Sequence, residues 1–459
     1  MDKTCAIVLA AGDGKRMKSK KSKVLCEVLF KPMISWVADA VKAAGINHCC
    51  VVVSPEGEAD IAPLLPEGFT TATQSQRLGT GHAASMAADY IREGGFTEVL
   101  VLFGDGPFFT APDISQGLAE HRRSGNSVTL YGTALSHPAG YGRLVQENGS
   151  LRIVEEKDAT EQQRNIREVS VGPHWFDAAF ALDFFANMSS DNAQNEYYLT
   201  DAAGYASKIS KKAGTFMVEA DHGHGANDRA GLAMLNDIAR REIIARHHTE
   251  GVDIPLPNNV IIGPDASIGA DTVILPGCIL RGKITIGEGC EIGPDTKLKN
   301  VVVGNRCLVQ SSFIEDSRVD DNARIGPWCN IRPGCVVGNG AKIGDYVELK
   351  NANIGSGTSV AHLTYIGDSD VGSGCNFGCG VVTANYDGKN KHRTVIGDNC
   401  FIGCNCNLVP PVNVGSRVYA ATGTTITDDV PDGALVIGRV RQEVKEGWAD
   451  KKGLFNKGS

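Results

Sequence analysis

From Gly251 onward, apolar residues recur every six positions, and this period constrains the fold more than any other feature. The first series is Ile262, Ile268, Ile274, Leu280, Ile286, Ile292 and Leu298, and the period resumes at Ile325, Ile354 and Ile396. A helix repeats every 3.6 residues and a strand every two, so neither explains it. A parallel β-helix does, because each triangular coil takes three hexads and each apolar residue points into the prism. The sequence therefore predicts a left-handed parallel β-helix of hexapeptide repeats over residues 251–440.

Glycines recur within this six-residue repeat, and the period shifts at some positions. Glycine follows four of the apolar residues directly, at Gly263, Gly269, Gly287 and Gly293. We expect these glycines at tight corners that require a positive φ. Slips of the period between Leu298 and Ile325 and near Val371 predict bulges or short external loops. The polar stretch 383–393, which contains Asn385-Tyr386-Asp387-Gly388, predicts a longer loop.

The first 229 residues alternate apolar runs with segments of helical periodicity. Continuous apolar runs lie at 5–10, 48–53 and 98–103, and residues 33–44 have helical spacing. Buried strands that alternate with helices predict an α/β domain, Rossmann-like, whose mostly parallel sheet has helices on both faces. The predicted divisions are a first domain, a linker helix, the β-helix and a tail, at residues 1–229, 230–250, 251–440 and 441–459. Whether the linker helix acts as a lever or only docks on the surface is left open.

Charge and composition exclude several classes of protein. The net charge is −8, which argues against nucleic acid or an anionic membrane as the main partner. No secretory signal pattern opens the chain, and no apolar run reaches about 18 residues. We therefore expect a cytoplasmic protein. The 14 cysteines are scattered and form no CxxC pair, so we expect reduced, mostly buried thiols instead of disulfides or a zinc site.

A small-residue turn follows the first predicted strand. It reads LAAGDGKRM over residues 9–17, and basic residues continue to Lys23. Backbone N–H groups of such a turn approach phosphate oxygens without a Cβ in the way. Arg16 and Lys23 would neutralise a triphosphate. The turn is not a Walker loop, because no Gly-Lys-Ser/Thr ends it.

The full string LAAGDGKRM is more specific evidence for a phosphate-binding turn than its two glycines alone. Together with Lys23-Val24-Leu25 and Lys31-Pro32-Met33, it resembles the opening of the sugar nucleotidyltransferases. Further matches are QSQRLGTGH at 74–82, FGDGP at 103–107, GYGR at 140–143, VEEKDA at 154–159 and NEYYLTD at 195–201. With the β-helix added, residues 5–439 resemble the family of bifunctional N-acetylglucosamine-1-phosphate uridyltransferases and glucosamine-1-phosphate N-acetyltransferases.

The resemblance implies a uridylyl transfer from UTP to N-acetylglucosamine 1-phosphate, with release of pyrophosphate and with Mg²⁺ as cofactor. The nucleotide would be held by Leu9, Ala10, Ala11, Gly12 and Lys23, with Arg16 on the phosphates. The uracil would be read by Gln74, Gly79 and Thr80. The remaining nucleotide and sugar contacts would come from Phe103, Gly104, Asp105, Gly140, Glu155, Ser170 and Asn227, where Ser170 replaces the family's Asn. The metal ligands would be Asp105 and Asn227.

Each of these residues also has a structural interpretation. Asp105 before Gly-Pro is typical of a turn, and Lys23 alone would be a solvated lysine. Asn227 precedes the predicted linker helix and by itself would be its N-cap. Only the surrounding strings favour the functional roles.

The second half carries its own polar residues beside the apolar hexads. An amine must lose a proton as it attacks a thioester, and an imidazole is a suitable general base. The strings AHLTYIGD at 361–368 and ANYDG at 384–388 resemble the acetyltransferase half of the family. The resemblance implies that His362 is the base and that Asn385 either orients it or binds the intermediate oxygen. It implies sugar-phosphate contacts from Arg332, Lys350, Tyr365 and Asn376.

Acetyl-CoA would be the second co-substrate, bound between the prisms of a homotrimer. Its contacts would be Cys379, Asn385, Tyr386, Cys404, Thr422 and Arg439. Cys379, Cys404 and Thr422 depart from the small residues, commonly Ala or Ser, of the family pattern. The implied order is acetyl transfer to glucosamine 1-phosphate, followed by uridylyl transfer.

Two other functions fit parts of the sequence. The first is a nucleotidyltransferase of another sugar phosphate, with the β-helix serving only as a trimer scaffold; the polar set around His362 argues against it. The second is a ligand-sensing subunit with decayed sites. The intact Lys23, Asp105, Asn227 and His362 argue against that function.

Overall fold

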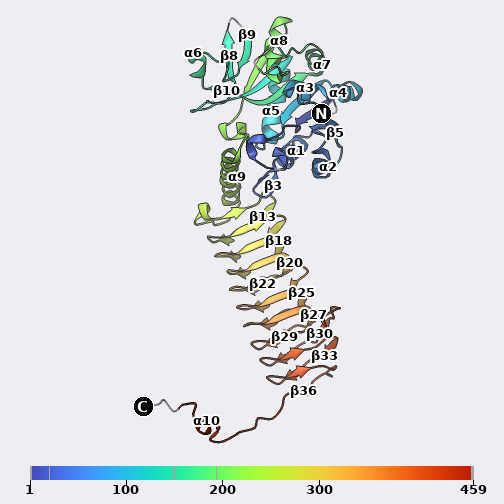
Figure 1. Cartoon of the computed structure of the whole chain (residues 1–459), viewed down its shortest axis with the longest axis vertical. Helices are drawn as coiled ribbons and strands as arrows, with labels where there is room; N and C mark the ends of the chain where they lie inside the picture. The colour runs from blue at the N-terminus through green and yellow to red at the C-terminus, as the bar shows by residue number, and fades with distance from the viewer. Residues whose placement is uncertain (1–2, 20, 148–149, 193, 456–459) are drawn as a thin grey trace. The chain divides into compact units, whose positions relative to one another are not determined.

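The computed structural model describes residues 3–19, 21–147, 150–192 and 194–455. The chain divides into two compact units, Met1–Arg240 and Arg241–Ser459, and helix α9 (Arg229–Thr249) runs across the division. Figure 1 labels the elements of both units. Among the described residues, no helix is both long enough and apolar enough to cross a membrane.

The first unit is built on a nine-stranded, mostly parallel sheet. Its main path is β11 (Ala213–Met217), β7 (Val128–Ala134), β10 (Glu168–Asp177), β6 (Glu98–Phe103), β1 (Thr4–Leu9), β4 (Cys49–Val53) and β5 (Phe69–Thr73). Strands β6, β1, β4 and β5 pair in parallel, whereas β10 is antiparallel to both of its neighbours. Off this path, β8 (Arg143–Glu147) pairs with β10 and with β9 (Ser150–Val154).

Helices cover both faces of this sheet because its central strands are apolar on both sides. In β1, Cys5 and Ile7 belong to one core cluster and Ala6 and Val8 to the other. The helices of the unit are α1 (Met33–Ala43), α2 (Glu58–Ile61), α3 (Thr80–Ser85), α4 (Ala88–Gly94), α5 (Ala111–Ser124), α6 (Glu161–Arg164), α7 (Ala178–Ala186) and α8 (Ala202–Lys208). The predicted α/β fold is therefore confirmed.

The second unit is a parallel β-helix with three faces. The first face contains β12 (Ile261–Ile262), β15 (Ile279–Arg281), β22 (Asn330–Ile331), β29 (Val382–Thr383), β32 (Asn407–Leu408) and β35 (Thr425–Ile426). The second contains β14 (Val273–Ile274), β17 (Glu291–Ile292), β19 (Leu308–Val309), β21 (Arg324–Ile325), β24 (Lys342–Ile343), β26 (Ser359–Val360), β28 (Asn376–Phe377), β31 (Phe401–Ile402), β34 (Tyr419–Ala420) and β36 (Leu435–Val436). The third contains β13 (Ala266–Ile268), β16 (Ile284–Ile286), β23 (Val336–Val337), β30 (Thr394–Ile396) and β33 (Val412–Val414). The short helix α10 (Trp448–Lys451) follows in the tail.

Four longer strands join the first face to the third: β18 (Lys297–Val303), β20 (Phe313–Val319), β25 (Glu348–Ile354) and β27 (Tyr365–Val371). In β25 the inward residues Leu349 and Ile354 are five positions apart, and Asn351 between them has a φ of 47°. The slips predicted after Leu298 and near Val371 are built in the same way, with Asn300 in β18 at a φ of 51° and Asp368 in β27 at a φ of 46°. The slips of the six-residue period are therefore shortened corners, and the predicted bulges or external loops were wrong there. An Asn or Asp in the left-handed region turns the chain with one residue fewer. The predicted loop is confirmed, since residues 384–393 lie between β29 and β30.

The expectation of a positive φ was also wrong for some corner glycines. Gly293 has a φ of 112°, but Gly269 and Gly287 are not among the residues with positive φ. A Cβ on Gly269 would lie 2.7 Å from the carbonyl carbon of Gly287 in the next coil. Glycine is needed at this position because stacked coils approach closely.

The cysteines of the β-helix mostly serve its interior. All 14 cysteines of the chain are free thiols, ten of them in the β-helix, and of the 14 only Cys379 and Cys404 are not buried. The Cys375 thiol donates to the carbonyl of Gly397 at 3.1 Å, as the Thr358 hydroxyl does to the carbonyl of Gly372 at 2.7 Å. Cysteine therefore replaces threonine as a donor between coils.

Candidate functional sites

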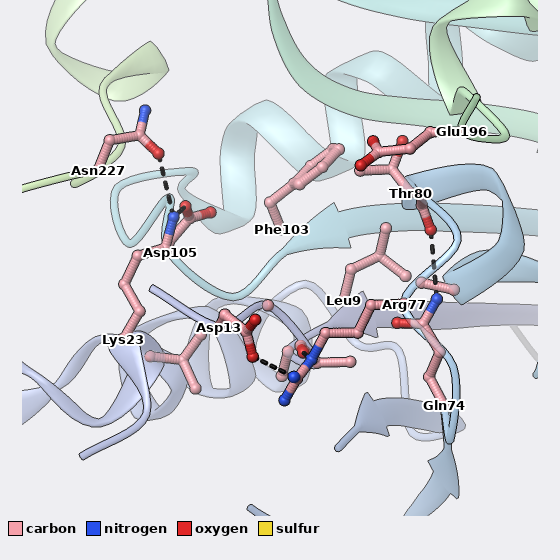
Figure 2. A pocket seen from close by; sticks show the side chains of 16 residues that line it. Leu9, Asp13, Lys23, Gln74, Arg77, Thr80, Phe103, Asp105, Glu196 and Asn227 are labelled. Carbon is pink, nitrogen blue, oxygen red and sulfur yellow. Dashed lines mark hydrogen bonds and ion pairs between the residues drawn. The ribbon is translucent and has the colours of Figure 1, made fainter. Parts of the chain in front are cut away.

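The small-residue turn after β1 opens into a cavity of about 540 Å³ at the carboxyl end of the sheet. Figure 2 shows this cavity from close by. Its lining includes most of the residues predicted for the nucleotide: Leu9, Ala10, Ala11, Gly12, Lys23, Gln74, Gly79, Thr80, Phe103, Asp105 and Asn227. Gly104 supports the wall, since its N–H donates to the carbonyl of Leu9 at 2.9 Å. Side chains from five separate segments therefore converge as the sequence predicts.

Lys23 lies between the two predicted metal ligands (Figure 2). Its ammonium forms an ion pair with Asp105 and donates to Oδ1 of Asn227 at 3.1 Å. Asn227 is not the N-cap of α9, because Oδ1 of Asp228 accepts from the N–H of Gly231 at 2.8 Å. The oxygens of Asp105 and Asn227 therefore already face a common cation.

Arg16 is placed differently from the other predicted phosphate ligands. It lies in the short helix η1 (Lys15–Met17), its side chain is exposed, and it is not among the residues that line the cavity.

Arg77 and Asp13 line the cavity and form an ion pair. Arg77 also donates through Nε to the carbonyl of Ala11 at 3.1 Å, so it joins the segment before α3 to the phosphate turn. Neither residue was assigned a role from the sequence, although both stand inside the strings that carried the resemblance. Val24, Ala83 and Glu196 complete the lining.

The predicted uracil residues form the other end of the cavity. The side-chain nitrogen of Gln74 donates to the carbonyl of Gly79 at 3.3 Å, and Gln74 is buried. Gly79 has a φ of 109°, and a Cβ there would lie 2.5 Å from the carbonyl oxygen of Tyr197. Only glycine fits this position. The Thr80 hydroxyl accepts from the N–H of Leu199 at 3.1 Å.

The predicted sugar residues outside the cavity lining lie close together. The N–H of Ser170 donates to the carbonyl of Gly142 at 2.8 Å, and a Cβ on Gly142 would lie 3.5 Å from Oε1 of Glu155. Burial raises the pKa of Glu155. The N–H of Gly140 donates to Oε2 of Glu156 at 3.1 Å. The hydroxyl of Ser170 is buried without a hydrogen-bond partner among the described residues.

In the second unit, His362 stands at a corner of the β-helix with a φ of 68°. Its Nδ1 lies 2.8 Å from Oδ1 of Asp345, and its ring is exposed. Of the two roles expected for Asn385, the contact that would orient His362 is made by Asp345 in this structure, and binding of the intermediate oxygen stays a prediction. Asn385 bonds to Asp368 and accepts a hydrogen bond from the hydroxyl of Tyr365 at 3.4 Å.

Cations gather beside this corner on the first face. The adjacent ammonium of Lys391 lowers the pKa of Lys350, and Arg332 lowers it further. Nη1 of Arg332 lies 3.1 Å from Oε1 of Glu348. Neighbouring like charges of this kind attract an anion. Lys391 was not among the predicted sugar-phosphate residues, because it lies in the loop after β29 and not on a hexad.

The other predicted acetyltransferase residues do not all lie on the same face as this cluster. Asn376 is in β28 on the second face, whereas Tyr365 is in β27 on the first. Arg439 donates to the carbonyl of Thr422, and both side chains are exposed. The hydroxyl of Tyr386 donates to the carbonyl of Gly388 at 2.7 Å, within the loop after β29. Cys379 is half-buried and Cys404 is exposed. A single chain therefore does not gather all of these residues on one face.

Comparisons with known proteins agree with both halves. A model described as the MobA-like NTP transferase domain matches residues 6–168, and one described as the GMPPB C-terminal domain matches residues 313–408. An α/β nucleotidyltransferase domain is thus followed by a hexapeptide β-helix, which defines a two-domain transferase.

Relatives match over nearly their whole length, and each is named Bifunctional protein GlmU. The protein of Thermoanaerobacter pseudethanolicus is 45% identical over 98% of this chain and 99% of its own. Those of Acetivibrio thermocellus and Clostridium acetobutylicum are 43% and 41% identical over 99% and 98% of this chain, and over 99% of their own. The chain belongs to the GlmU family of bifunctional proteins. This confirms the predicted function, synthesis of UDP-N-acetylglucosamine by a uridylyltransferase and an acetyltransferase in one chain.

Proposed function

We propose that uridylyl transfer takes place in the cavity beside the small-residue turn. The observation that carries this proposal is the convergence of Lys23, Asp105 and Asn227 beside that turn. The turn would receive the triphosphate on its backbone N–H groups, and Lys23 would leave its ion pair to neutralise phosphate charge. The sugar phosphate would enter from the side of Gly140 and Glu155.

The chain needs no nucleophile of its own for this reaction. A phosphate oxygen of N-acetylglucosamine 1-phosphate would attack the α-phosphorus of UTP in line, and pyrophosphate would leave. The residues of the cavity would contribute orientation and charge neutralisation.

The residues fit a bound Mg²⁺. Asp105 and Asn227 offer one carboxylate and one amide oxygen, both directed at the same cation in this structure. Two hard oxygen ligands suit Mg²⁺, which keeps water and substrate phosphates in its remaining positions. Bound Mg²⁺ would stabilise the charge that develops on the phosphates.

Replacing the carboxylate tests this site. Asp105→Ala should lower uridylyl transfer by about two orders of magnitude, the scale of losing one preorganised charge-stabilising element. Acetyl transfer should be unchanged, and calorimetric titration should detect weaker Mg²⁺ binding. A variant as active as the wild type at low Mg²⁺ would rule out the metal role.

We also propose that acetyl transfer takes place around His362. Asp345 would hold Nδ1–H of the imidazole, which leaves the Nε2 lone pair to accept a proton from the attacking amine. Arg332 and Lys350, with Lys391 beside them, would bind the phosphate of glucosamine 1-phosphate. Acetyl-CoA would lie along Cys379, Cys404, Thr422 and Arg439.

Replacing the base tests the second site. His362→Ala should abolish acetyl transfer because it removes the proposed general base, whereas uridylyl transfer should be unchanged. Equal loss of both activities would show that the two sites are not separate. Asp345→Ala should lower kcat for acetyl transfer with a smaller effect on KM, because it acts through His362.

The separation of Asn376 and Tyr365 on two faces supports a homotrimer in which neighbouring chains complete each acetyl-transfer site. The 14 unpaired thiols support a reducing, cytoplasmic setting.

A further inference from the structure

His82 belongs to the string at 74–82, yet neither proposed reaction uses it. It lies in α3 between Thr80 and Ala83, which line the cavity, but it is not itself among the lining residues. Its Nδ1 is 2.9 Å from the side-chain nitrogen of Gln74, and its ring stacks on Tyr197 with centroids 6.3 Å apart. This contact therefore bears on the orientation of the Gln74 side-chain amide.

The second partner of the same nitrogen fixes how the Gln74 amide is oriented. The carbonyl oxygen of Gly79 can only accept a hydrogen bond, so the NH₂ group of Gln74 must face it. The other N–H of that group then donates to Nδ1 of His82, which requires the neutral ring with its proton on Nε2. Both amide hydrogens are therefore used, and Oε1 is left for the cavity. In Figure 2 this oxygen points to the cavity side, away from the contact with Gly79.

An amide oxygen in this position distinguishes one pyrimidine from the other. Uracil presents an N3–H donor, whereas cytosine presents an N3 acceptor beside an amino group. Oε1 of Gln74 accepts from uracil N3–H but opposes the lone pair of cytosine N3. An amide rotated by 180° would reverse this preference.

We propose that His82 is a positioning residue that sets the base specificity of uridylyl transfer by fixing the orientation of the Gln74 amide. The proposal rests on the proposed role of Gln74 in the uracil site. It goes beyond that role because His82 is not among the residues that line the cavity. Without an acceptor at Nδ1, Gly79 would be the one remaining partner of this nitrogen among the described residues, and a CTP-compatible orientation of the amide would become accessible.

Two variants of His82 separate this role from packing. His82→Leu removes the acceptor, and His82→Asn restores one near the position of Nδ1. We expect His82→Leu to lower the ratio of kcat/KM for UTP to that for CTP by about tenfold, the scale of one misplaced hydrogen bond. His82→Asn should recover most of the ratio. Thermal unfolding of the same full-length variants reports whether the first unit is folded.

The outcomes distinguish a failure of the role proposed for His82 from a failure of the proposed uracil site. A role in packing alone would weaken both nucleotides equally and leave the ratio unchanged in His82→Leu, which would overturn the inference. Gln74→Met tests the uracil site itself. If Gln74→Met lost the UTP preference while His82→Leu kept it, Gln74 would still read the base and only the role of His82 would be refuted. If Gln74→Met kept the preference, the proposed uracil site and the inference would fail together.

Discussion

At the scale of single residues, the small-residue turn after β1 contains a carboxylate where an anion is expected to bind. Asp13 lies in this turn and forms an ion pair with Arg77, which also holds the Ala11 carbonyl. A negative charge beside a triphosphate is unfavourable unless it is compensated. Arg77 therefore allows the turn to carry an acidic residue.

Removing Arg77 should expose this conflict. Arg77→Gln should raise KM for UTP by about tenfold, since the charge of Asp13 beside the phosphates is then less compensated. Asp13→Asn combined with Arg77→Gln should recover most of the affinity, because the repelling charge is gone too. Steady-state kinetics on both variants measure this, with acetyl transfer as the control. A double variant as impaired as Arg77→Gln would contradict the explanation.

The exposed cysteines lead to a second prediction at this scale. Cys404 is exposed and Cys379 half-buried, whereas burial raises the pKa of the nearby Cys406 thiol and keeps it unreactive. A maleimide should therefore label Cys404 and inactivate acetyl transfer while uridylyl transfer persists. Bound acetyl-CoA should slow both labelling and inactivation. If the maleimide inactivated Cys404→Ser at the wild-type rate, labelling of Cys404 would not be the cause of the inactivation.

At the scale of elements, the hexad repeat predicted the β-helix because most intervals between inward residues have the same six-residue spacing. The corners were less predictable. A six-residue interval and a five-residue interval both keep the apolar residue inside, and only the left-handed Asn351 and its equivalents show how the shorter one closes. The glycines that lack a positive φ are required by a close contact between successive coils, and the local sequence does not show this contact.

The sites, too, were predictable in part. The strand ends and the small-residue turn predicted the place of the cavity in the first unit, because the carboxyl ends of parallel strands meet at one edge of the sheet. The partnerships of Arg77 with Asp13 and of His362 with Asp345 could not be predicted, since each joins residues from different elements. Lys391 lies outside the repeat, where no period marks it.

The donors between coils give a testable stability effect. The Thr358 hydroxyl accepts from the N–H of Cys375 at 3.0 Å and donates to the carbonyl of Gly372. Thr358→Val keeps the shape but leaves both groups unpaired, which should cost about 1–3 kcal/mol. Thr358→Cys should cost less, because the thiol can both donate and accept as cysteines do in other coils. Thermal unfolding at fixed protein concentration compares the two; equal destabilisation would contradict this account.

At the scale of the whole molecule, α9 indicates where the chain can be cut. Arg229 donates to the carbonyl of Met17 at 3.1 Å, and Oδ1 of Asn236 accepts from the N–H of Leu29 at 3.0 Å. A fragment of residues 1–240 keeps the contact of Asn236, which residues 1–229 lack, so it should retain uridylyl transfer and unfold at a higher temperature than residues 1–229. Equal melting temperatures would show that the residues from 230 to 240, with the contact of Asn236, contribute nothing.

The proposed trimer makes the most demanding prediction. If each acetyl-transfer site takes its residues from two chains, Tyr365→Ala and Asn376→Ala disable different contributors to one site. Co-refolding the two variants should then restore activity at about one quarter of the sites by random assembly, although each variant alone is inactive. Light scattering should give three times the 48.6 kDa of one chain. A monomeric mass, or no recovery in the mixture, would mean that each chain builds its site alone.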